Sequence, residues 1–61
     1  MEIYFIIDRC WNGSDTYYRV KLEINGEILD VYNKTYNYKD AIKTLRIDNN
    51  LQHKKAKYCF L

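Results

Sequence analysis

Apolar and polar residues alternate along the first half of the chain, a pattern typical of half-buried β-strands. Two Asn-Gly dipeptides, Asn12-Gly13 and Asn25-Gly26, interrupt this alternation. Asn-Gly between alternating apolar residues is a strong hairpin signal, because a type I′ turn needs positive φ at both of its central positions. The pattern therefore predicts three antiparallel strands, at residues 2–10, 15–24 and 27–36.

Each Asn-Gly dipeptide, read as a two-residue turn, predicts which residues face each other. The expected pairs are Ile7–Tyr18, Phe5–Val20 and Ile3–Leu22 at the first turn, and Ile24–Glu27, Leu22–Leu29, Val20–Val31 and Tyr18–Asn33 at the second. Both turns place the same residues of the middle strand on one face, whereas a one-residue slip would invert every side chain. The predicted buried face consists of Ile3, Phe5, Ile7, Tyr18, Val20, Leu22, Ile24, Leu29 and Val31.

After Tyr36 the pattern changes to a helical period. Asn37 is a candidate N-cap with Asp40 in the first turn, and Asn49-Asn50 is a candidate stop signal. Apolar residues repeat at helical spacing between them, at Tyr38, Ala41, Ile42 and Leu45. The segment predicts a helix of about three turns that covers the sheet.

The tail from Lys54 to Leu61 predicts a fourth strand, because Ala56, Tyr58 and Phe60 alternate with Lys55, Lys57, Cys59 and Leu61. The right-handed crossover rule places this strand beside the first and parallel to it. The expected fold is one α+β domain over residues 1–61, with βββαβ order, strand order 3-2-1-4 and one uncovered sheet face. The expected core comprises Ile3, Phe5, Val20, Leu22, Leu29, Val31, Ala41, Ile42 and Leu45.

The length of 61 residues excludes a large multi-substrate enzyme, because so short a chain buries only about 60% of its unfolded surface. The longest apolar run, Ile3 to Ile7, is far shorter than the ~20 residues of a membrane span. Residues 1–8 also lack the features of a secretory signal. We therefore expect a cytoplasmic location and no membrane partner. Cys10 and Cys59 are expected to be free thiols there, although one disulfide could stabilise so small a domain.

The predicted strand order resembles the first half of a ribonuclease H fold, and Asp8 near the end of the first strand is similar to that family's first metal-binding aspartate. This resemblance implies two-metal hydrolysis of nucleic acid. Only Asp40 could match the family's helix glutamate, and Cys59-Phe60-Leu61 stands where a carboxylate should end the fourth strand. Because two-metal chemistry needs several converging carboxylates, we expect no nuclease activity.

Other catalytic sites find equally little support in the residues. His53 lies in the basic run of residues 52–55 and is expected to be a solvated loop residue. Cys10 and His53 lack an orienting third group for nucleophilic catalysis. Cys10, His53 and Cys59 offer three widely spaced zinc ligands, whereas structural zinc sites usually have four in short-spaced pairs. The sequence therefore predicts a non-enzymatic protein without a metal or a cofactor.

Tyrosines and cations gather on the uncovered sheet face and at its first turn. The candidate partner-binding residues are Tyr4, Trp11, Tyr17, Arg19, Lys21, Tyr32, Lys34 and Tyr36. Tyr and Arg often anchor protein interfaces, and Tyr with Lys or Arg also binds single-stranded nucleic acid. The net charge of +2 is small for a nucleic-acid binder, so a protein or nucleoprotein partner is favoured and nucleic acid is the alternative. Trp11 is either an anchor or a lid packed over the end of the sheet.

The amino-acid composition and the small size resemble those of one general class of proteins. Asn, Lys, Tyr and Ile fill 27 of 61 positions, a bias that AT-rich codons would produce. With the small size and the lack of a recognisable active site, this bias resembles the small inhibitors encoded by phages and mobile elements, including anti-CRISPR proteins. The resemblance implies an inhibitor that blocks a host protein or nucleoprotein complex in the host cytoplasm. A cellular interaction module is the alternative, and the pattern leaves monomer and homodimer open.

Overall fold

The chain forms one mixed four-stranded sheet and one helix, and the computed structural model describes all of residues 1–61. The elements are β1 (Ile3–Trp11), β2 (Thr16–Ile24), β3 (Glu27–Thr35), α1 (Tyr38–Asp48) and β4 (Lys57–Phe60). The sheet order is β3-β2-β1-β4, with β4 parallel to β1 and the other neighbours antiparallel. The predicted α+β fold and its strand order are confirmed, and the first three strands match to within one residue.

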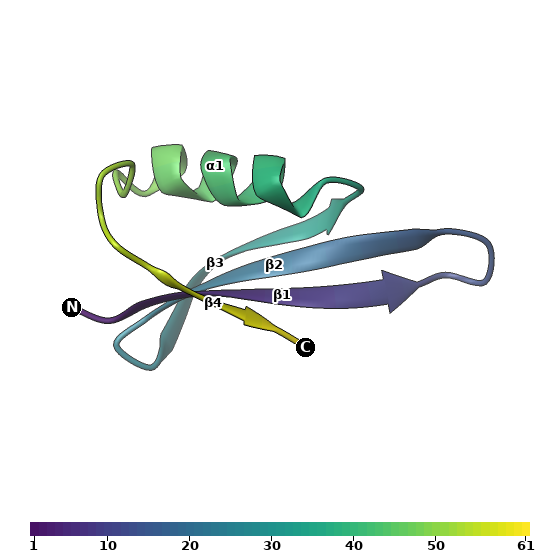
Figure 1. Cartoon of the computed structure of the whole chain (residues 1–61), viewed down its shortest axis with the longest axis horizontal. Coiled ribbons are helices and arrows are strands. Elements are labelled where there is room, and N and C mark those ends of the chain that lie inside the picture. Colours follow the sequence, from purple (N-terminus) through teal and green to yellow (C-terminus); the bar gives the residue numbers. More distant parts are fainter.

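Helix α1 lies across one face of the sheet, over β2 and β3 (Figure 1). The tip of the β1–β2 hairpin extends beyond the helix, and β4 lies at the opposite edge of the sheet from β3. The other face of the sheet, called the outer face below, is covered by no further element. The molecule is therefore elongated, with extents of 38 × 20 × 15 Å.

The core lies between α1 and the sheet and is entirely apolar. Its nine buried residues are Ile3, Phe5, Ile7, Val20, Leu22, Ala41, Ile42, Leu45 and Leu51. Full burial of a large aliphatic or aromatic side chain contributes about 1.5–3 kcal/mol, so this small set provides most of the stability. Leu51 was not predicted to be a core residue, because it follows the helix and belongs to no periodic pattern.

The predicted register of the first hairpin is wrong by two residues, although the predicted face is right. The observed partners of Ile3, Phe5 and Ile7 are Ile24, Leu22 and Val20. The loop has four residues, because the Asn12 side chain accepts hydrogen bonds from the Ser14 and Asp15 backbone N–H groups at 3.1 and 2.8 Å. Asn12-Gly13 thus opens a longer loop instead of forming the whole turn.

The second hairpin begins as predicted and then departs from the expected register. Asn25 and Gly26 have φ of 52° and 86°, as a type I′ turn requires, and Ile24 faces Glu27. A β-bulge follows at Leu29, so Leu22 faces Asp30 and not Leu29. A further irregularity near residues 33–34 brings Thr35 opposite Tyr18, where Asn33 was expected. Each bulge adds one residue to β3 and reverses the faces beyond it.

The bulge at Leu29 makes four predicted placements in β3 wrong, those of Leu29, Asp30, Val31 and Tyr32. Leu29, predicted as core, is 52% exposed, and Val31 is half-buried on the outer face opposite Lys21. Tyr32, predicted on the outer face, lies opposite Val20 and packs against the core. Asp30 also moves to the helix side, where its carboxylate accepts a hydrogen bond of 3.0 Å from Asn49. The bulge therefore allows a hydrogen bond between Asp30 of the sheet and Asn49 at the end of the helix.

Both ends of α1 are capped as the sequence predicts. The Asn37 side chain accepts from the Lys39 N–H at 3.1 Å, and Asp40 lies in the first turn, where a negative charge favours the helix dipole. At the other end Asn49 is the C-cap, and its side chain donates to the Leu45 carbonyl at 2.8 Å. Asn50 has a positive φ of 57° and ends the helical path.

Leu22 and Leu29 were expected to face each other in the core, and the structure separates them. We predict that Leu22→Ala lowers the free energy of unfolding by about 2–5 kcal/mol, because it leaves a cavity under α1. The matched change Leu29→Ala should alter it by no more than about 0.5 kcal/mol, because the side chain is already exposed. Urea denaturation of the two variants measures both values. Equal costs would contradict the observed bulge.

Candidate binding surfaces

The outer face carries two clusters in which a lysine lies over tyrosine rings. The Lys34 Nζ lies 5.3 Å from the centre of the Tyr17 ring and 5.6 Å from that of Tyr36. At the other end of the sheet, the Lys57 Nζ lies 5.7 Å from the centre of the Tyr4 ring. Each cation–π contact of this kind restricts the lysine and the tyrosine side chain, and at an exposed site it contributes about 0.5–1 kcal/mol. These clusters mark the two ends of the outer face.

The middle of the outer face combines apolar and charged side chains. Ile6 lies between Cys59 and Lys21 on the neighbouring strands, and Lys21 in turn faces Val31. Asp8 lies directly opposite Arg19, and Glu23 lies opposite Tyr4. Four cations, Arg19, Lys21, Lys34 and Lys57, thus share the face with the two carboxylates of Asp8 and Glu23. Most of these side chains are half-buried by their neighbours, so the face is ordered without a covering layer.

Most of the predicted binding residues share this face, but Tyr32 and Trp11 do not. Tyr4, Tyr17, Arg19, Lys21 and Lys34 lie there, with Tyr36 at the β3 end. Tyr32 lies on the helix side because of the bulge described above. Trp11 ends β1 opposite Thr16, and strand alternation also puts it on the helix side, beyond the reach of α1. It is 71% exposed, so it does not pack over the end of the sheet.

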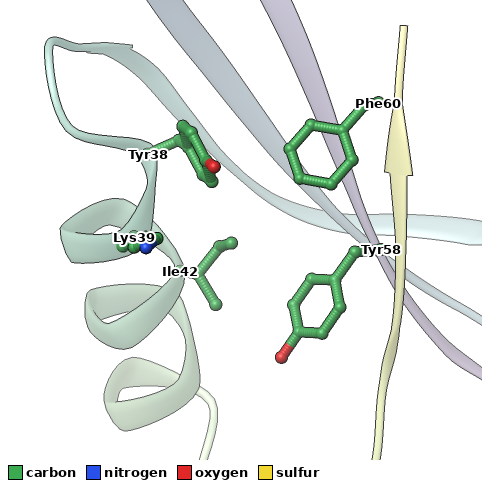
Figure 2. A pocket seen from close by; sticks show the side chains of 5 residues that line it. All are labelled: Tyr38, Lys39, Ile42, Tyr58 and Phe60. Carbon is green, nitrogen blue, oxygen red and sulfur yellow. The ribbon is translucent and has the colours of Figure 1, made fainter.

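A groove lies between α1 and β4. The sequence pattern does not predict it. Figure 2 shows Tyr38 and Ile42 of the helix facing Phe60 and Tyr58 of the strand, with Lys39 on the helix beside them. The groove has a volume of about 370 Å³. Tyr38 and Phe60 meet edge to face at 5.4 Å, while Tyr58 stacks on Phe5 at 5.9 Å. The groove remains open because α1 sits over β2 and β3.

Arg46 connects α1, the following loop and β4. One guanidinium nitrogen donates to the carbonyls of Leu51 and Lys54 at 2.8 and 2.7 Å, and the other donates to the Tyr58 hydroxyl at 2.9 Å. The guanidinium also lies 5.2 Å from the centre of the Phe5 ring. Arg46 therefore positions the strand that forms one wall of the groove. No periodic pattern could have shown this role, since two of the three hydrogen-bond partners are backbone groups of an irregular loop.

The residues considered for catalysis or metal binding do not converge. Cys10 and Cys59 are free thiols, half-buried and exposed respectively, and His53 lies exposed in the loop before β4. Asp8 lies in β1 and Asp40 on the exposed side of α1. No group of three or more His, Cys, Asp or Glu side chains is arranged to hold a metal ion. The helix α1 is too short and too polar to cross a membrane.

Comparisons with known proteins assign no relative to this chain. No protein-family model matches it, and neither a curated protein nor a solved structure shows significant similarity. The two surfaces described above are therefore the basis for a functional proposal.

Removal of the Arg46 guanidinium should weaken the attachment of β4. We predict that Arg46→Met lowers the free energy of unfolding by about 1.5–3 kcal/mol, because two carbonyls and a hydroxyl lose a charged donor while the stem is kept. Lys43→Met removes the same charge from an exposed helix position and should change stability by no more than about 0.5 kcal/mol. Hydrogen exchange at the Leu61 N–H, which bonds to the Ile7 carbonyl, should accelerate only in Arg46→Met. Equal behaviour of the two variants would contradict this role.

Proposed function

We propose that this protein is a non-enzymatic protein-binding module that acts by occupying a partner's surface with its outer face. The observation that carries the proposal is the ordered array of tyrosines and cations on a sheet face that no element covers. Interfaces are enriched in Tyr and Arg, because these residues contribute a large contact area and directed hydrogen bonds. Inhibition of a host protein or nucleoprotein complex, in the manner of small phage inhibitors, is the specific form that we propose.

The contacts on the outer face favour a protein over single-stranded nucleic acid. The ammonium groups of Lys34 and Lys57 already lie over the rings of Tyr17, Tyr36 and Tyr4, on which bases would have to stack. The carboxylates of Asp8 and Glu23 stand within the same face and would repel phosphates. A protein surface can meet both signs of charge and can also cover apolar Ile6. The excess of cations over carboxylates favours a partner patch that is acidic.

The outer face is suited to tight binding because its side chains are already held in place. Cross-strand neighbours and cation–π contacts restrict the tyrosines and lysines before a partner arrives. Ordering a long side chain at an interface otherwise costs about 0.5–1.5 kcal/mol. A rigid sheet face therefore loses little conformational entropy on binding.

The double variant Arg19→Ala with Tyr36→Ala tests whether the outer face is the binding surface. A photo-reactive amino acid at position 21, in the middle of this face, should form one major protein adduct in native cells, and the adduct should persist after nuclease treatment. Excess wild-type protein should abolish the adduct, whereas excess double variant should compete at least tenfold less well, as expected for the loss of two interface anchors.

Position 44 provides the matched control, because Thr44 is exposed on the helix. A photo-reactive residue at this site should give no corresponding adduct. An adduct from position 44 with none from position 21 would show that the helix is the binding surface. If the adduct from position 21 is lost with nuclease, and binding of an oligo-dT strand falls steeply with salt, the nucleic-acid alternative is correct.

The non-enzymatic part of the proposal rests on the scattered carboxylates and is tested at Asp8. The wild-type protein with magnesium should cleave neither DNA nor RNA, single- or double-stranded. Asp8→Asn should leave the competition for the position-21 adduct unchanged within a few-fold, because it keeps the shape of the side chain. Magnesium-dependent cleavage by the wild type that disappears in Asp8→Asn would overturn the proposal and support the ribonuclease H resemblance.

A further inference from the structure

We infer that the open edge of β4, with the exposed rings of Tyr58 and Phe60, is a second binding site that accepts an extended peptide of alternating apolar and acidic residues as a fifth strand. This site differs from the outer face in its residues and in its mode of binding. It does not depend on the function proposed above.

The backbone of β4 has unused hydrogen-bonding groups at this edge. β4 is one of the two edge strands of the sheet and pairs only with β1. In a parallel ladder, alternate residues direct both backbone groups toward the same neighbour. The Leu61 N–H donates to the Ile7 carbonyl, so Leu61 and the alternate residues before it face β1. The N–H and C=O groups of Tyr58 and Phe60 therefore point to the open edge, where an added strand can pair with them.

The side chains of the same two residues form a wall of the groove. Tyr58 is 49% exposed and Phe60 is 61% exposed, and both face Tyr38 and Ile42 across the groove. Every second side chain of an added strand would point to the helix side of the sheet and lie against the exposed rings of Tyr58 and Phe60, where it would bury apolar surface. Strand pairing provides affinity and these two rings select apolar side chains at alternate positions, which is the usual division of roles in strand addition.

Charge favours acidic residues at the intervening positions. Lys57 lies on the outer-face side of β4, and the exposed Lys54 and Lys55 precede it. Acidic side chains of the added strand on the outer-face side would lie beside Lys57, where opposite charges on neighbouring strands stabilise the pair.

The same observations disfavour two other occupants. A second copy paired through its own β4 would bring another run of Lys54, Lys55 and Lys57 close to the first, and like charges at a strand edge prevent such pairing. Single-stranded nucleic acid lacks the evenly spaced N–H and C=O groups with which a strand would pair with Tyr58 and Phe60. The rings of these residues are also engaged with Phe5 and Tyr38.

The probe is a synthetic peptide in which Val and Glu alternate over eight residues. Titrated into the isotope-labelled protein, it should shift the backbone amide signals of Tyr58 and Phe60 in a saturable manner. A scrambled peptide of the same composition should bind at least tenfold more weakly, because its Val residues no longer share one face. N-methylation of one alternate set of peptide residues should abolish binding, and N-methylation of the other set should not, because only one set faces β4.

Two pairs of protein variants provide matched controls. Phe60→Ala should weaken peptide binding at least tenfold, whereas Trp11→Ala, at another exposed strand aromatic, should leave it unchanged. Lys57→Glu should weaken binding several-fold, and Lys34→Glu should not. The outer-face variant Arg19→Ala with Tyr36→Ala should bind the peptide normally, so failure of one proposal is distinguishable from failure of the other. Circular dichroism checks that each variant keeps the fold.

The inference is overturned if the alternating and scrambled peptides bind equally, or if N-methylation of either set has no effect. It is also overturned if oligo-dT displaces the peptide and shifts the same amide signals more strongly. A mass that doubles with protein concentration, with protection of the Tyr58 and Phe60 amides, would identify a second copy as the occupant instead.

Discussion

The guanidinium of Arg46 is the interaction on which the open side of this molecule depends. It reaches from α1 to the carbonyls of Leu51 and Lys54 and to the Tyr58 hydroxyl, so one charged group directs the loop and places β4. A neutral donor at this position would hold the strand less firmly, because hydrogen bonds from charged donors are about twice as strong as those from neutral donors. The groove and the exposed edge of β4 both follow from this placement.

The position of α1 over the sheet depends on a contact with β3. The bulge at Leu29 turns Asp30 toward the helix, where its carboxylate binds Asn49, and Asn49 also caps α1. The helix is thus held over β3 at its C-terminal end, and Asn37 caps its N-terminal end. With α1 fixed over β2 and β3, the edge strand β4 lies beyond the reach of the helix. The apolar faces of Tyr58 and Phe60 remain in solvent for this reason.

The parts of the structure with a local signal could be predicted, and those with a distant partner could not. Alternation and helical period identified every element, and crossover handedness gave the strand order. The bulge in β3 is accompanied by a hydrogen bond from Asn49 to Asp30, 19 residues apart in the sequence. Tyr32 was therefore assigned to the wrong face. The four-residue first loop is an exception, because the bonds of the Asn12 side chain that define it are local. The sequence does not predict the groove. Alternation in β4 indicates that one side of the strand faces the core, but it does not show whether the helix extends far enough to cover that side.

The parallel pairing of β1 with β4 also bears on the order in which the chain folds. The two hairpins join strands that are close in sequence, whereas Tyr4–Ile7 must meet Lys57–Phe60 across nearly the whole chain. Closing so long a loop costs more entropy than closing a hairpin, so β4 is expected to pair last and to detach first. Short-lived openings that release β4 while β1, β2 and β3 stay paired would leave the edge of β1 exposed. Until β4 has been synthesised and has paired, the edge of β1 is therefore open to pairing with another chain.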